Sequence, residues 1–144
     1  MRDNIWLKDR MDTLWSSFFS DVERKNNIVI RFKGRWKNKF GHIKRLKNTD
    51  TEICINGVFM NERVPQEIIN VTLAHEICHY AHGFNSPHEK HFKHPHQGGV
   101  VRRELINRGF KNSLIFEKKF IKEDWTKLYR ELCPDKVRSL FRWF

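Results

Sequence analysis

The segment from Pro65 to Gly83 is the feature that most constrains the fold of this chain. It predicts a helix with Ile, Val, Leu and Tyr side chains around much of its circumference. A helix that is apolar on nearly all sides is buried inside a domain and does not lie on its surface. Pro65 suits the start of a helix, where its missing N–H costs nothing, and Gly83 suits the end. The rest of the chain is therefore expected to pack around this helix.

Within one turn of this apolar helix lie His75, Glu76 and His79. The two histidines are four residues apart, so one helical turn places both imidazoles on the same face. Two such nitrogens can bind one Zn²⁺ at about 2.0–2.1 Å each, and Glu76 can accept a proton from the water that zinc activates. Buried charge is costly unless it is paired or binds a metal. The sequence thus predicts one zinc ion per chain, with His75 and His79 as ligands and Glu76 as the catalytic base.

A catalytic zinc site needs a third protein ligand and one open position. The metzincin pattern, with Gly three residues and His six residues after the second histidine, is excluded because His82 and Asn85 occupy those positions. The remaining candidates are His88, His91, His96 and Glu104. We favour His96, because it follows a loop long enough to return over the central helix and directly precedes the next helix. The other three stay open as alternatives.

Hydrophobic periodicity predicts the remaining elements. Helices are expected at Leu7–Val22, Val100–Arg108, Leu114–Leu132 and Asp135–Trp143, and strands at Ile28–Phe32, Gly41–Lys47 and Glu52–Asn56. The 144 residues suit one compact domain. The expected fold class is α+β and zincin-like: a small antiparallel sheet, an N-terminal helix, the central helix with its HExxH sequence, and C-terminal helices.

Charge and cysteine content bear on partners and location. Lys and Arg number 28 against 17 Asp and Glu, which gives a net charge of +11. This surplus favours a polyanionic partner, with DNA or RNA first, although a solvated basic surface is the simpler alternative.

The three cysteines are odd in number and lack CxxC spacing, so we expect free thiols and neither disulfides nor a zinc ribbon. Without a signal-peptide core or an apolar run of about 18 residues, the expected location is the cytoplasm, with association with DNA or the nucleoid as an option.

The segment from Arg35 to Phe110 resembles the SprT-like, or Spartan-type, metalloprotease domain. The resemblance is carried by Arg35-Trp36 before Gly41, by the strand Ile53–Asn56, by Pro65-Gln66-Glu67 leading into Thr72–His79, and by His96 followed by Val100 and Gly109. It implies a zinc metalloendopeptidase that acts on proteins associated with or crosslinked to DNA. It also implies that His75, His79 and His96 are the zinc ligands and that Glu76 is the base. Residues 1–144 would form one such domain, with 111–144 as a helical C-terminal extension.

A second function remains open. The chain could be a basic nucleic-acid-binding module in which zinc is structural and peptide hydrolysis is insignificant. A closed site of four protein ligands, such as His75, His79, His88 and His96, would favour this alternative. An open fourth position would favour the enzyme.

Overall fold

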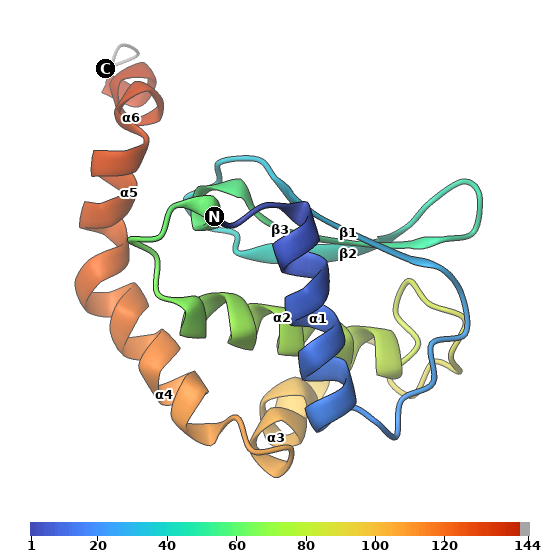
Figure 1. The fold of residues 1–144 in the computed structure, drawn as a ribbon. Coiled ribbons are helices and arrows are strands. Elements are labelled where there is room, and N and C mark those ends of the chain that lie inside the picture. The colour runs from blue at the N-terminus through green and yellow to red at the C-terminus, as the bar shows by residue number, and fades with distance from the viewer. Residues whose placement is uncertain (142–144) are drawn as a thin grey trace.

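The structure is a computed structural model that describes residues 1–141, with side chains up to residue 137. It has an α+β fold in which the helices cover one face of a small sheet (Figure 1). The elements are α1 (Asn4–Phe18), β1 (Ile28–Lys33), β2 (Gly41–Arg45), β3 (Thr51–Asn56), the 3-10 turn η1 (Gly57–Met60), α2 (Gln66–Ala81), the 3-10 turn η2 (Gln97–Gly99), α3 (Val100–Asn107), α4 (Lys111–Phe120), the π-helical segment η3 (Ile121–Trp125), α5 (Thr126–Leu132) and α6 (Pro134–Phe141).

The predicted helices and strands are present, and they differ from expectation mainly at their ends. The first helix stops at Phe18 and not at Val22, although Val22 is still buried in the turn that follows. The helix predicted from Leu114 begins three residues earlier and contains a π-helical segment. The last predicted helix reaches Phe141, and its predicted end at Trp143 lies outside the described residues. None of the helices within residues 1–141 has the length and apolar character needed to cross a membrane.

The sheet is mixed, so the prediction of an antiparallel sheet is wrong for one of its two strand pairs. The order is β1-β3-β2, with β3 parallel to β1 and antiparallel to β2. The loop 34–40 passes around the end of β3, where the amide of Asn56 donates to the carbonyl oxygens of Trp36 at 2.6 Å and Lys39 at 2.8 Å. Because of this loop, β2 does not pair with β1 but lies one strand position away from it. The third strand occupies the position between them and runs parallel to β1.

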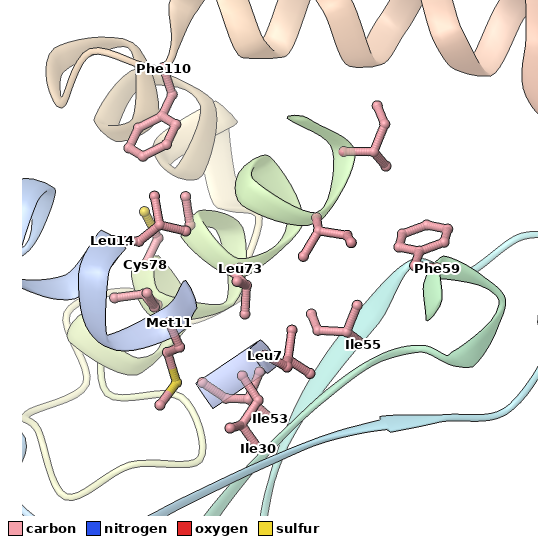
Figure 2. Packing of buried hydrophobic residues seen from close by; sticks show 14 of the residues in the cluster. Leu7, Met11, Leu14, Ile30, Ile53, Ile55, Phe59, Leu73, Cys78 and Phe110 are labelled. Carbon is pink, nitrogen blue, oxygen red and sulfur yellow. The ribbon is translucent and has the colours of Figure 1, made fainter. Parts of the chain in front are cut away.

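The hydrophobic core lies between the sheet and the helices α1 and α2 (Figure 2). Side chains from α1, β1, β3 and α2 meet there, including Leu7, Met11, Ile30, Ile53 and Leu73. Burying a side chain of this kind contributes about 1.5–3 kcal/mol relative to leaving it exposed. The helix α2 has buried residues around most of its circumference, as its sequence predicts.

A tight turn after α2 directs the chain back over this helix. Gly83 has a φ of +83°, and a Cβ atom there would lie 2.4 Å from the carbonyl oxygen of Glu89. A side chain at this position would be strained and would also clash with backbone. Beyond the turn, His91 N–H donates to the carbonyl oxygen of His82 at 3.0 Å, which holds the returning loop against the end of α2. This loop leads to His96.

The helical segment α4–η3–α5 runs along the outside of the fold (Figure 1). At one end, α4 contacts α2 and α3. Toward the other end, the Trp125 indole N–H donates to the carbonyl oxygen of Lys37 at 2.7 Å, and the Tyr129 hydroxyl donates to that of Arg35 at 2.9 Å. The segment therefore contacts both the helices below the sheet and the loop that connects β1 with β2.

Candidate metal centre

Three histidines converge at one point on the surface of α2. His75 and His79 lie one turn apart on α2, and His96 comes from the loop directly before η2. The Nε2 atoms of His75 and His79 are 3.0 Å apart, and those of His75 and His96 are 3.1 Å apart. The structure thus brings together the two histidines of the helix and the favoured third candidate. Within the described residues, these three form a group whose geometry is consistent with a bound metal ion.

The other three candidates for the third ligand lie elsewhere. His88 Nε2 donates to the carbonyl oxygen of Glu23 at 2.6 Å. His91 lies beside His82, with ring centroids 6.2 Å apart. The carboxylate of Glu104 contacts His82 Nε2 at 2.7 Å. These side chains are therefore engaged away from the group formed by the three converging histidines.

The donor chemistry of the three histidines fits a metal ion. Burial, with a smaller effect of the neighbouring histidines, lowers the pKa of His75 to about 4 and that of His79 to about 3. Both rings are therefore neutral at pH 7, as metal ligands must be. His75 Nε2 carries either one proton or one lone pair, so it cannot form good hydrogen bonds with both His79 and His96. A tetrahedral zinc with bonds of about 2.0–2.1 Å would separate its nitrogens by roughly 3.3–3.4 Å, close to the observed spacing.

Glu76 lies beside this group, at a pocket of about 350 Å³ that also has His75, His96 and Lys39 in its lining. Its side chain is 5% exposed, and this burial raises the pKa of Glu76 to about 8, against a small opposing effect of Lys39. A dication held nearby would favour the carboxylate form, which is the form that can accept a proton.

Gly41 at the start of β2 allows the sheet to approach the pocket closely. A Cβ atom at this position would lie 2.9 Å from both the Cys54 carbonyl oxygen and the Thr72 methyl group. Any side chain here would therefore push β2 away from α2. The close approach keeps this edge of the sheet in the pocket lining, next to Glu76.

Two adjoining pockets contain His75 and His96 in their lining, and together they are called the cleft below. Residues of α4 also line this cleft, although the sequence alone did not predict it. Glu117 lines the pocket that contains Glu76, and Leu114 lines a second pocket beside His75 and His96. The two residues are three apart and so lie on the same face of α4. No spacing or motif in the sequence signals them, because their role depends on how α4 packs against α2 and α3.

A polar network behind the histidines fixes α3. His82 Nε2 contacts Glu104, and Arg108 forms two hydrogen bonds with the carboxylate of Asp21, at 2.7 and 2.9 Å. Arg108 also donates to Glu104 at 3.3 Å. Bidentate pairs of this kind restrict geometry as well as adding energy. The network ties α3 to the end of α2 and to the turn after α1.

A second group of metal-binding residue types lies on the outer face of the sheet. Its members are His42 on β2 and Glu52 and Cys54 on β3. Glu52 is paired with Arg31 at 3.0 Å and with Lys44 at 3.8 Å. Burial opposes its ionisation, yet a hydrogen bond from the Cys54 thiol and these two cations hold the pKa of Glu52 below its ordinary value. The carboxylate of this group therefore already has partners.

Comparison with known proteins bears on this geometry. The model of the SprT-like family matches residues 7–101, which is well over half of the 144 residues. The matched region includes His75, Glu76, His79 and His96, and it ends at the beginning of α3. The chain matches no curated protein and no solved structure.

Proposed function

Since the chain belongs to the SprT-like family, whose members are metalloprotease-like domains, we propose that it is a zinc-dependent endopeptidase of the HExxH type. His75, His79 and His96 hold the zinc ion, and Glu76 is the catalytic base. The observation that carries the proposal is the convergence of the three Nε2 atoms, 3.0 and 3.1 Å apart, next to a buried carboxylate in an open pocket.

The mechanism is peptide hydrolysis by an activated water. A zinc ion held by His75, His79 and His96 would supply Lewis-acid chemistry, which would polarise the scissile carbonyl and lower the pKa of water. The carboxylate of Glu76 accepts the proton from the attacking water and then delivers it to the leaving amine. Because Glu76 is only 5% exposed, bulk water has little access to the proton during this transfer.

The alternative of a closed structural zinc site has less support. A structural site is filled by four protein ligands, whereas a catalytic site has three and an open position. Among the described residues, the group around the zinc position has three members, His75, His79 and His96. His88, the fourth ligand expected for a closed site, is hydrogen-bonded to Glu23 instead.

The substitution Glu76→Gln tests this function directly. Glutamine keeps the size of the side chain but cannot accept the proton, so peptide hydrolysis should fall by about 10²–10⁴-fold. Zinc content should remain at about one ion per chain, because Glu76 is not a ligand. Hydrolysis of a DNA-bound protein, and of the chain itself, would be measured with and without DNA. Glu123→Gln makes the same change at an exposed position and should retain full activity.

Equal hydrolysis by the parent protein and by Glu76→Gln, with zinc bound in both, would refute the assignment. So would full zinc retention in His75→Ala or His79→Ala. A parent protein that binds zinc but hydrolyses no peptide would favour the structural-zinc alternative.

We also propose that the substrates are proteins associated with DNA, and that DNA contacts the outer face of the sheet. The helices lie against the opposite face. On the outer face Arg31, Lys33 and Lys44 surround the single carboxylate of Glu52, and Lys39 follows in the adjoining loop. This surface has the charge that phosphate groups require.

The DNA proposal predicts a steep dependence on salt. Each phosphate contact adds about 0.9 to the slope of log affinity against log salt concentration, because binding releases counterions. The double variant Lys33→Ala/Lys44→Ala should therefore lower the slope by about 2. The matched control Lys118→Ala/Lys119→Ala removes the same charge from exposed positions on α4. An equal loss of slope in both variants, or an affinity independent of salt, would contradict the proposed surface.

A further inference from the structure

We propose that the pocket beside His75 and His96 binds one aliphatic or aromatic side chain of the peptide substrate, and that Leu114 of α4 determines this preference. The inference rests on the proposed endopeptidase function and adds a substrate class to it. It concerns the side chain next to the cleaved bond, because two of the three proposed zinc ligands form part of the pocket wall.

The shape and lining of the pocket suit an apolar side chain. Its volume is about 240 Å³, and Val101, Leu105 and Leu114 contribute aliphatic surface, together with Gly99 and Arg102. Sites for whole drug-sized ligands have volumes of about 300–1,000 Å³, so this pocket suits a single side chain better than a complete small molecule. Among the described residues that line the pocket, Arg102 carries a charge, whereas His75 is neutral at pH 7.

The pocket is preformed, because both of its helical walls are anchored. On one side, α3 is held by the contacts of His82 with Glu104 and of Arg108 with Asp21. On the other side, the Ser113 hydroxyl of α4 donates to the carboxylate of Glu67 on α2. Leu114 itself packs against the hydrophobic core. Because the walls of the pocket are already fixed, binding of the substrate incurs no entropic cost for ordering them. The preference of the pocket for an apolar side chain should therefore appear directly as a difference in binding affinity.

Leu114 is the wall residue best suited to control the preference. Val101 and Leu105 are at most 4% exposed and belong to the core, whereas Leu114 is only partly buried. It also lies beyond residue 101, where the match to the SprT-like family ends. The proposed preference therefore depends on α4, which lies outside the matched region.

Two short peptide hydroxamates test the inference through binding. A hydroxamate binds the zinc ion, and one probe would carry a Leu side chain at the adjoining position whereas the other would carry Gly. Differences of one or more methylene groups in an apolar pocket change recognition by about 10–200-fold. The Leu probe should therefore bind the zinc-loaded parent protein at least about 10-fold more tightly than the Gly probe, as measured by calorimetry.

Leu114→Glu should remove this difference, because it places a carboxylate in the apolar wall, and Leu114→Ala should reduce it. The control Ile115→Glu makes the same kind of change on the same helix, where Ile115 is 56% exposed and does not line the pocket. The difference should persist in the control. Zinc content and thermal unfolding of each variant would establish that it folds. Cleavage products of the parent protein should be enriched in Leu, Ile, Met or Phe next to the cleaved bond.

The outcomes separate this inference from the proposed function. A Leu preference that depends on Leu114, in a protein that hydrolyses no peptide, would support the pocket and refute the endopeptidase. Hydrolysis that depends on Glu76, combined with equal binding of the two hydroxamates, would refute the pocket alone. Binding of neither probe, or a Leu preference that survives Leu114→Glu in a folded protein, would also overturn the inference.

Discussion

Two groups of side chains in this molecule have the residue types that bind metals, and their surroundings differ sharply. One group is His75, His79 and His96 in the cleft, and the other is His42, Glu52 and Cys54 on the outer face of the sheet. In each group the possible ligand atoms lie within 4.8 Å of one another. Proximity and residue type therefore do not distinguish the two.

The distinction lies in the charges around each group. On the sheet, the carboxylate of Glu52 already interacts with Arg31 and Lys44, so a metal ion would meet two cations there. Burial and the neighbouring Glu52 also raise the pKa of the Cys54 thiol, which keeps it protonated. In the cleft, by contrast, the three Nε2 atoms point at one another, and His75 and His79 are neutral at pH 7. We infer that the cleft binds the metal and that the sheet group stabilises the fold.

The largest expected effect is the loss of zinc from the cleft. His96→Ala removes one of three proposed ligands, so zinc affinity should fall by more than the roughly 10–100-fold that the loss of an outer-sphere partner causes. His88→Ala is the matched control and should leave the affinity unchanged, because His88 contacts Glu23. Competition with a fluorescent chelator would measure both. If Glu104→Ala removes the metal while His96→Ala does not, the ligand set proposed for the cleft is wrong.

An intermediate effect is expected on stability when the sheet group is changed. Glu52→Gln leaves Arg31 and Lys44 without their carboxylate, which should lower the free energy of unfolding at pH 7 by about 1–3 kcal/mol. The folded state holds the pKa of Glu52 below its ordinary value of 4.5, so its stabilisation is present above pH 4.5 and is lost as the pH falls below that value. The difference between parent and variant in urea unfolding should thus be smaller at pH 3.5 than at pH 7.

The exposed substitution Glu123→Gln serves as the control for this measurement and should change stability little at either pH. A difference between the parent and Glu52→Gln that is equal at both pH values, or larger at pH 3.5, would mean that Glu52 is not stabilised as an anion.

The smallest expected effect is on the zinc content when Cys54 is replaced. If the sheet group binds no metal, Cys54→Ala should retain about one zinc ion per chain, the same as the parent protein. Elemental analysis of both proteins, purified in parallel, would measure this. Two zinc ions in the parent and one in the variant would contradict the contrast drawn between the two groups.

The cleft was partly predictable from the sequence, because three of its central residues lie within five consecutive positions of one helix. The four-residue spacing of His75 and His79 fixes their common face on any α-helix, and Glu76 follows from the same motif. The choice among His88, His91, His96 and Glu104 depends on how the loop after Gly83 folds back, which composition alone does not determine. The structure places His96 at the cluster and the other three away from it.

The sheet was less predictable, because strand order is not local. A short β-branched run identified the first strand and alternating residues identified the other two. The parallel pairing of β1 with β3, however, depends on the path of the loop 34–40 around Asn56. The contributions of Leu114 and Glu117 to the cleft were also missed. They arise from the packing of α4 against α2 and α3. The hydrophobic pattern of a helix predicts the helix itself, but it does not predict which distant site the partly exposed face of that helix will contact.

The π-helical segment Ile121–Trp125 has a consequence for the rotational phase of the long helix that contains it. An α-helix turns by about 100° per residue, so the one extra residue of a π turn shifts all following side chains around the axis by about that angle. This shift allows Leu114 to line the cleft while Trp125 and Tyr129 hydrogen-bond to the loop 34–40. If the same residues formed a regular α-helix instead, one set of contact residues would turn away from its target by about 100°. The alignment of cleft and loop thus depends on one extra residue and on the wide turn that accommodates it, and deleting one residue from Ile121–Trp125 together with the wide turn would preserve that alignment.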